Sequence, residues 1–260
     1  MGMPETPGRP ASPSADRVLT VLETLVAAGE GLTLTALAHA ADISLATCAS
    51  IAYTLEQRGY AARRVVGRSH FWRPTMRLYG LGSSLVRKGD LAGIAGPYLR
   101  VLADELNMPA HAGVLDGASV VYVAKAAASG FIQFDTYPGK LAPFNLTALG
   151  RAIAAHLPDA ELEPLLSRLV PGTGPKAKRA TPRAFRAQLA KVRQTGYAVE
   201  DEEEEAEIAC VAAPVFNAEG RVVGSVGVTG FSREIAKRGL AAAAGLVVGQ
   251  AGEISAGLGF

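Results

Sequence analysis

Five basic side chains lie close together in the first third of the chain, on either side of a glycine. Arginines and lysines in such a cluster can neutralise nucleic-acid phosphates. If about four of them neutralised phosphates in each half-site, a plot of the logarithm of affinity against the logarithm of salt concentration would have a slope of roughly −3 to −4. The same pattern also fits a solvated hairpin face. The residues, around Gly67, are Arg63, Arg64, Arg68, His70 and Arg73.

A helical pattern precedes this cluster, and its polar face carries no cation. Ile43, Thr47, Ile51 and Leu55 recur at helical spacing and predict the buried side. Without Arg or Lys, the outer face cannot form bidentate contacts with guanine, which leaves hydrogen bonds from Ser and Tyr and contacts with thymine methyls. We therefore expect the basic hairpin to supply much of the affinity for DNA. The outward residues are Ser44, Leu45, Ala46, Ala49, Ser50 and Tyr53.

Nucleophilic or metal-binding chemistry has little support in the sequence. The two cysteines, Cys48 and Cys210, are far apart and form no zinc-binding pattern. Cys210 lies among apolar residues, where the pKa of a thiol rises and its nucleophilicity falls. His111 begins an apolar segment and is interpreted as a core or pocket residue. We expect no metal, no cofactor and no enzymatic activity.

The elements that carry these residues suggest two folded parts. Leu34 to Leu55 reads as two short helices around a polar break, and the basic hairpin follows. This is the pattern of a winged helix-turn-helix, which presents its second helix to the major groove of DNA. We predict a disordered tail over 1–14, a DNA-binding domain over 15–74, a helical linker over 75–108 and a second domain over 109–260.

The second domain is predicted to be α+β with a mainly antiparallel sheet. Strand-like segments at 111–115, 119–125, 131–137, 197–199, 209–216 and 222–229 alternate with helices that are segregated from them. Asn145 is expected to cap a helix that runs to residue 156, and a closing helix is expected from Ser232. In the first domain, Ser14 or Asp16 is the expected cap of the first helix.

Composition favours a globular protein of the cytoplasm. Among the 260 residues, 49% are hydrophobic and 19% charged, and the formal net charge of +2 carries no global signal for nucleic acid. The first fourteen residues are rich in Pro, Gly and Ser and do not resemble a signal peptide. The apolar tract 240–248 is far shorter than the roughly 20 residues that span a bilayer, so no membrane partner is expected.

Several segments, taken in order, resemble the IclR family of bacterial transcriptional regulators. They are RVLTVLETL at Arg17, LTLTALAHAADIS at Leu32, TLEQRGY at Thr54, NLTALGRAI at Asn145, GYAVEDEE at Gly196, CVAAPVF at Cys210 and RVVGSVGVTG at Arg221. The resemblance implies a GAF-like effector-binding domain after the winged helix-turn-helix, and a homodimer or homotetramer. GRSHFWRPTMRLYGLG and PYLRVLADEL resemble the branch that senses aromatic acids.

The resemblance also implies an effector site, and the residues suggest an acidic effector. Free N–H groups at the start of the Asn145 helix suit a carboxylate, and Phe131, Phe134, Tyr137 and Phe144 offer aromatic surface, although Phe131 and Phe134 equally suit an ordinary core. Gly227 stands where relatives often have serine, and Glu200 where aspartate is frequent, so the pocket is expected to be wider or reshaped. The family positions are Thr147, Ala148, Leu149, Glu200, Cys210, Gly227 and Thr229.

Together these features predict a ligand-responsive regulator of transcription. It would bind a palindromic operator in double-stranded DNA, with half-sites about one helical turn or a multiple of it apart, and respond to a small carboxylic acid. One alternative is a metabolite-binding protein or enzyme whose winged domain no longer binds DNA, as the uncharged helix face would allow. Another is a cysteine-dependent hydrolase using Cys210.

Overall fold

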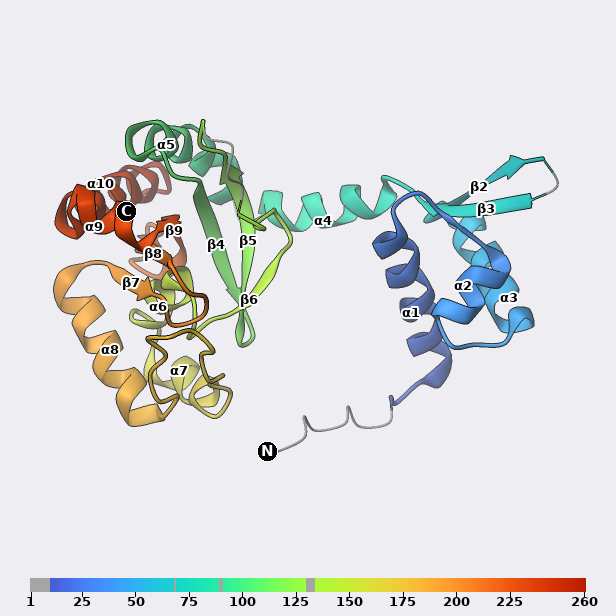
Figure 1. Cartoon of the computed structure of the whole chain (residues 1–260), viewed down its shortest axis with the longest axis horizontal. Coiled ribbons are helices and arrows are strands. Elements are labelled where there is room, and N and C mark those ends of the chain that lie inside the picture. The colour runs from blue at the N-terminus through green and yellow to red at the C-terminus, as the bar shows by residue number, and fades with distance from the viewer. Residues whose placement is uncertain (1–9, 68, 89–90, 130–133) are drawn as a thin grey trace. The chain divides into compact units, whose positions relative to one another are not determined.

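A computed structural model describes residues 10–67, 69–88, 91–129 and 134–260. The chain divides into two compact units, residues 1–85 and 86–260. Figure 1 shows the elements of each unit.

The first unit is a helical cluster with a small antiparallel sheet. Ser12 caps the first helix through its Oγ, so the helix begins earlier than the expected caps Ser14 and Asp16. The two-residue strand β1 was not predicted, and it adds to the hairpin edge in the order β1-β3-β2. The elements are α1 (Pro13–Ala28), β1 (Leu32–Thr33), α2 (Leu34–Ala40), α3 (Leu45–Gln57), β2 (Ala61–Val66), β3 (Ser69–Pro74) and, up to residue 85, α4 (Arg77–Lys88).

The helix-turn-helix and the wing are present as predicted. α2 and α3 meet at 109°, within the range usual for this motif. The turn between them places Asp42 at a φ of 51°, a left-handed conformation that Asp tolerates better than most residues. Val21, Leu25, Leu37, Cys48 and Trp72 are buried in the core beneath the two helices. This core fixes how α3 and the hairpin are presented.

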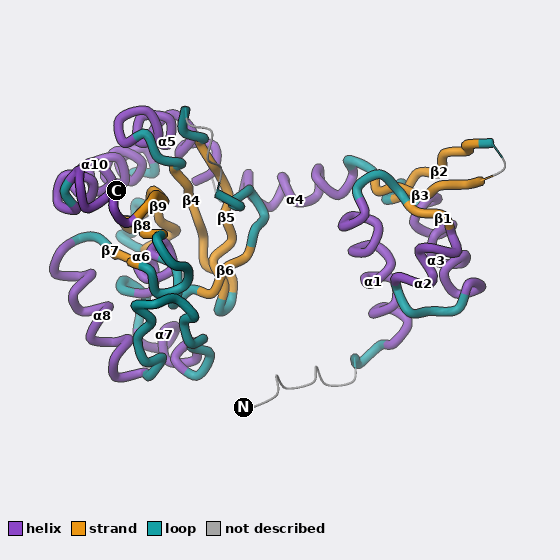
Figure 2. The backbone as a smooth tube through the Cα atoms, viewed as in Figure 1, coloured by secondary structure: helices purple, strands orange, loops and turns teal. Residues whose placement is uncertain are grey.

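The second unit is a six-stranded antiparallel sheet covered by helices on both faces. The strand order is β6-β5-β4-β9-β8-β7, and Figure 2 shows these strands between α5 and α10 on one side and α6, α7 and α8 on the other. The elements are α5 (Leu91–Leu106), β4 (Ala110–Asp116), β5 (Ser119–Ala126), β6 (Leu141–Pro143), α6 (Ala148–Ala154), α7 (Asp159–Leu166), α8 (Pro182–Thr195), β7 (Ala198–Asp201), β8 (Ile208–Phe216), β9 (Val222–Phe231), α9 (Ser232–Arg238) and α10 (Leu240–Gly257).

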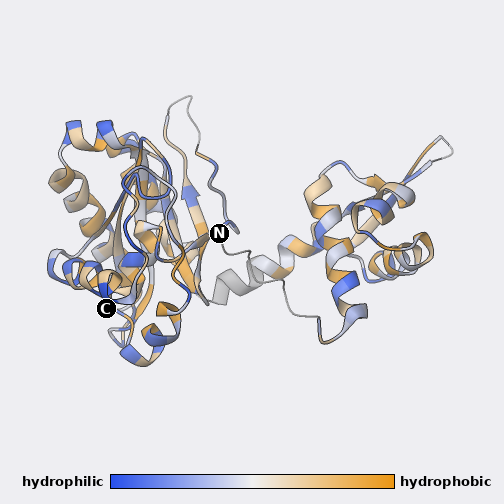
Figure 3. Ribbon diagram, turned by 60° about the horizontal axis from the view of Figure 1, so that its bottom comes forward, coloured by the Kyte–Doolittle hydropathy of each residue, from blue (hydrophilic) through white to orange (hydrophobic). Residues whose placement is uncertain are grey.

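Each face of this sheet has its own apolar core because side chains alternate along a strand. On β8, Val211 and Val215 face α5 and α10, whereas Ala212 belongs to the core under α6 and α8. Several of these strands have the orange of hydrophobic residues in Figure 3. The expected linker segment 75–108 contains α4 and α5, and α5 contributes Leu99, Leu102 and Leu106 to the core of this unit.

Three predictions of local structure in the second unit are wrong. The part of the expected 131–137 strand that is described, 134–137, is not a strand, and the edge strand is the short β6. Asn145 does not cap a helix; its side chain bonds the backbone of Val170, and Thr147 caps α6. The closing helix is interrupted at Gly239, whose φ of 92° favours glycine, so α9 and α10 are separate.

α10 has 18 residues and is apolar and long enough to cross a bilayer by length and composition alone. Ala243, Val247, Ala251 and Ile254 on one side of it are buried in the core against the sheet. One side of α10 therefore packs against the sheet.

Candidate functional site

The outer surface of α3 is assembled from the residues that sequence analysis placed there. Ser44 is the N-cap, and its Oγ accepts a hydrogen bond from the Thr47 N–H at 3.2 Å. Ser44, Leu45, Ala46, Ser50 and Tyr53 are exposed, while Ala49 is half-buried. The face therefore has hydroxyls and small apolar groups, and no cation comes from α3 itself.

The pairing of β2 with β3 divides the wing cations between its two faces. Arg63 pairs with Trp72, and Arg64 with Phe71. Because paired residues share a face of the ribbon, Arg63 and His70 lie on the Trp72 face. Arg64 and Arg73 lie on the opposite face. All four are exposed, and Arg68 lies outside the described residues.

Arg63 has partners within its own unit. Its guanidinium carbon is 5.5 Å from the centre of the Tyr53 ring and 5.7 Å from that of Trp72, and its Nε is 3.7 Å from the Glu56 carboxylate. Tyr53 in turn meets Trp72 edge-on, with 5.1 Å between ring centres. These contacts join the wing to α3, so the position of Arg63 depends on both elements.

In the second unit, a cavity of about 220 Å³ lies between the sheet and the start of α6. Residues at alternating strand positions face it: His111 on β4, Tyr122 on β5, Cys210 and Ala212 on β8, and Gly227 and Thr229 on β9. Thr147, Ala148 and Leu149 line it from α6. Ser225 fastens the helix to the sheet, because its Oγ donates to the Leu149 carbonyl at 3.0 Å.

The start of α6 offers backbone donors to this cavity. The Thr147 Oγ1 accepts from the Gly150 N–H at 3.0 Å, and the Arg151 N–H bonds the Thr147 carbonyl. The N–H groups of Ala148 and Leu149 come earlier in the first turn and have no acceptor within the helix. An anionic oxygen in the cavity could accept from both.

The other polar groups of the cavity are uncharged at neutral pH. Burial, with a contribution from the Lys125 charge, lowers the pKa of His111 to about 3, so its ring is neutral. Burial raises the pKa of Tyr122, and burial together with Glu200 raises the pKa of Cys210 to about 12. The His111 Nε2 and the Thr136 Oγ1 are hydrogen-bonded at 2.8 Å, and the Cys210 Sγ and the Thr229 Oγ1 at 3.3 Å.

Glu200 lies beside the cavity rather than in its lining. It pairs with Cys210 across β7 and β8 and is buried. Its Oε1 accepts from the N–H groups of Glu203 at 2.8 Å and Glu204 at 3.2 Å. Burial raises its pKa, which these backbone bonds oppose. Glu200 thus holds the turn after β7 next to Cys210.

Gly227 has a structural role besides the one expected. A Cβ built on it would lie 2.3 Å from the Val211 carbonyl oxygen and 2.8 Å from the Ala212 Cβ. The glycine therefore allows β8 and β9 to approach closely in addition to opening the cavity. A serine would require the strands to shift.

Of the two aromatic residues predicted for the site, Phe134 does not line the cavity. The Phe134 ring is half-buried and lies 5.9 Å from that of Phe231, centre to centre, and Phe131 lies outside the described residues. His111 was expected to be a core or pocket residue, and Tyr122 was not predicted as part of the site. Strand alternation on β4 and β5 was the available signal, but it does not reveal which strands become neighbours.

Comparison with known families agrees with this arrangement. Residues 14–64 match the IclR helix-turn-helix domain, and residues 83–256 match the C-terminal domain of bacterial IclR transcriptional regulators. The chain belongs to the IclR family. It is a transcriptional regulator with an N-terminal DNA-binding domain and a C-terminal effector-binding domain, which confirms the predicted family, fold class and general function.

Individual IclR regulators are similar over nearly the whole chain. XynR of Escherichia coli K12 is 30% identical over 226 residues, 84% of this chain and 85% of XynR. The Thermotoga maritima IclR structure has a TM-score of 0.81 at 26% identity, covering 95% and 99% of the two chains. A Microbacterium hydrocarbonoxydans IclR homolog complexed with 4-hydroxybenzoate has a TM-score of 0.80 at 21% identity, covering 94% and 98%; this likeness concerns the fold.

Proposed function

We propose that this IclR regulator binds a small organic monoacid in the cavity under α6 and that the acid changes its affinity for operator DNA. The ligand class rests on the N–H groups of Ala148 and Leu149, which have no hydrogen-bond partner among the described residues and belong to a cavity with a neutral polar lining. They would receive the carboxylate. The cavity is small in this structure, which favours a compact acid such as a benzoate.

The cavity residues suggest how the acid would be oriented. With its carboxylate at α6, the rest of the molecule would lie toward Tyr122, Thr229 and Cys210, whose hydroxyl and thiol groups can bond a ring hydroxyl. Glu200 would act through its contact with Cys210. The apolar lining from Ala148, Leu149 and Ala212 supports an aromatic or other compact apolar body.

A thermal-shift screen of small carboxylic acids tests this part. Bound ligand stabilises the folded state by mass action, so we expect a rise in melting temperature with benzoates. Thr147→Val, which removes the capping hydroxyl while keeping the side-chain shape, should weaken the rise. If benzoates leave the melting temperature unchanged and glyoxylate-like acids raise it, the proposal of an aromatic ligand is refuted.

For DNA, we propose that α3 reads shape and methyl groups, and that the wing contributes most of the phosphate contacts. The oligomer is proposed to be a homodimer or homotetramer in the cytoplasm, which would place two reading units on a palindromic operator. We expect Arg64→Ala to weaken operator binding more than Ser50→Ala, and the same ranking for Arg68→Ala. A gel-shift titration with the upstream region of its own gene measures this.

The main alternative is a protein that binds a metabolite without binding DNA. It predicts no retarded band with that upstream DNA even at low salt. A catalytic role for Cys210 is disfavoured because a pKa of about 12 keeps the thiol protonated. If Cys210→Ala still binds the ligand and neither protein shows turnover, the catalytic role is refuted. If the parent shows turnover that Cys210→Ala has lost, the catalytic role is established.

A further inference from the structure

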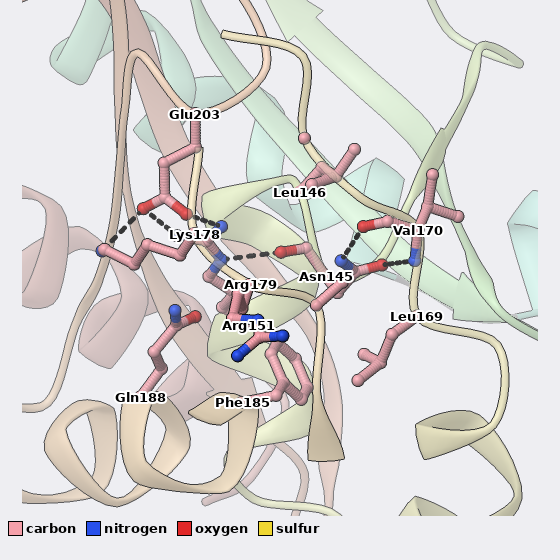
Figure 4. A pocket seen from close by; sticks show the side chains of 12 residues that line it. Asn145, Leu146, Arg151, Leu169, Val170, Lys178, Arg179, Phe185, Gln188 and Glu203 are labelled. Atoms are coloured by element: carbon pink, nitrogen blue, oxygen red, sulfur yellow. Dashed lines mark hydrogen bonds and ion pairs between the residues drawn. The ribbon is translucent and has the colours of Figure 1, made fainter. Parts of the chain in front are cut away.

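A second cavity, of about 310 Å³, lies in the same unit and shares no lining residue with the first. Figure 4 shows its polar side chains, which come from the start of α6, the loop before α8, α8 itself and the turn after β7. The polar lining consists of Asn145, Arg151, Lys178, Arg179, Gln188 and Glu203.

The inner wall is a buried ion pair held in a fixed position. The Arg151 Nη1 and Nη2 donate to the two Glu203 carboxylate oxygens at 3.0 and 2.9 Å. The same guanidinium donates to the carbonyls of Asn145 and Val199. Both side chains of the pair are about 5% exposed. All the charge of Glu203 is thus matched by Arg151 inside the protein.

Positive charge remains at the mouth of this cavity. The Lys178 Nζ gives one N–H to the Glu203 Oε1 at 2.8 Å, and its side chain is 59% exposed. Within the described part of the chain, the guanidinium of Arg179 and the amide of Gln188 have no hydrogen-bond or ion-pair partner, although both line the cavity. Counting Arg151, Lys178 and Arg179 against Glu203, the lining has a formal charge of +2.

Burial of Glu203 opposes its ionisation, but the hydrogen bonds from Arg151 and Lys178 outweigh this and lower its pKa. The carboxylate is therefore already paired when a ligand arrives. The donors that remain free are the fork of Arg179, the other N–H groups of Lys178 and the Gln188 amide. A guanidinium fork beside an ammonium suits an anion with several oxygens.

We propose that this cavity binds a small, multiply charged oxyanion, held by Arg179, Lys178 and Gln188 in front of the Arg151–Glu203 pair. Phosphate esters and dicarboxylates share this chemistry. The site is separate from the cavity under α6 and does not depend on the ligand proposed there. It would give the protein a second chemical input.

Isothermal titration calorimetry of the full-length protein tests the site, with inorganic phosphate and malonate as probes at constant ionic strength in a buffer without either. We expect saturable binding of at least one probe, at about one per chain. Arg179→Gln should weaken it at least about tenfold, the effect of losing a charge-assisted bond. Thermal melts of the variant should match the parent because Arg179 is exposed.

Arg183→Gln is the matched control, since Arg183 is an exposed arginine nearby on α8 that does not line the cavity. It should leave the affinity within about twofold. Phosphate binding without malonate binding would point to a phosphorylated ligand, and the reverse to a dicarboxylate. Binding of neither probe, unchanged affinity in Arg179→Gln, or equal losses in both variants would overturn the proposal.

Discussion

The buried His111 should make the second unit sensitive to mild acid. Its ring is 1% exposed, and burial with the Lys125 charge lowers its pKa from 6.5 to about 3. Because the pKa of His111 is lower in the folded state than in the unfolded state, the unfolded chain binds a proton between these two pKa values and the folded chain does not. Stability from this residue is therefore complete above pH 6.5 and is lost as the pH falls from 6.5 toward 3.

The size of the effect follows from the distance between the two pKa values. Each pH unit below the unfolded pKa costs about 1.36 kcal/mol until the folded pKa is reached. At pH 5, which is 1.5 units below 6.5, the loss is about 2 kcal/mol. At pH 7.5 it is close to zero.

Urea unfolding of the parent and of His111→Gln at pH 7.5 and pH 5 measures this loss. Gln cannot titrate, yet it can still bond Thr136. The single tryptophan, Trp72, belongs to the first unit, so its fluorescence reports that unit and serves as an internal control. Circular dichroism follows both units.

Between the two pH values, the parent should lose about 2 kcal/mol more than His111→Gln in the transition of the second unit. Other groups whose pKa values are shifted, including His156, Glu200 and Glu203, are present in both proteins and cancel in the comparison. Equal pH dependence in the two proteins would refute the reasoning, whatever the absolute stability of the variant.

Three further perturbations test the packing around the two cavities. Glu203→Gln leaves the Arg151 charge buried without its partner and should lower the free energy of unfolding in urea by about 3–5 kcal/mol. Lys176→Gln breaks ion pairs nearer the surface and should leave the urea midpoint nearly unchanged. Similar unfolding curves for the two variants would contradict this reasoning. Gly227→Ser should lower the melting temperature because its Cβ would meet the Val211 carbonyl, and an unchanged melt would show that β8 and β9 adapt freely. In the folded protein at pH 8, Cys210 should react with iodoacetamide at least about a hundredfold more slowly than in the protein unfolded in urea, because burial raises the pKa of its thiol to about 12. Equal rates would mean that the thiol of the folded protein is accessible and ionisable.

Local patterns were sufficient for much of the fold. The spacing of Ile51 and Leu55 located the buried side of α3, and the turn at Gly67 located the wing, because helical periodicity and turn chemistry depend on neighbouring residues. The part of the cavity formed by Thr147 to Leu149 could also be predicted from the sequence, because these residues are consecutive and lie in a segment that resembles the family.

The rest of the cavity depends on strand pairing across long stretches of chain. His111 reaches Gly227 through the β4–β9 pair, and Tyr122 joins them because β5 pairs with β4. Neither contact leaves a trace in the residues on either side of His111. The expected strand 131–137 also depended on pairing. Its described part, residues 134–137, forms no strand, and the strand that pairs with β5 is β6, at residues 119–121 of β5.

In the wing, the strand register identifies the face on which each arginine lies, which the number of charges alone does not. Strand alternation puts the adjacent Arg63 and Arg64 on opposite faces, and the register shows that Arg63 is the one that shares its face with Trp72. Arg63 is held by Tyr53, Trp72 and Glu56, so replacing it would change both the charge and the attachment of the wing to α3. Arg64 is exposed and pairs across the ribbon with Phe71. If Arg64 contacts a phosphate, Arg64→Ala should reduce the salt slope by about 0.9 per half-site. A change in affinity without that reduction would mean that the opposite face of the wing meets the DNA.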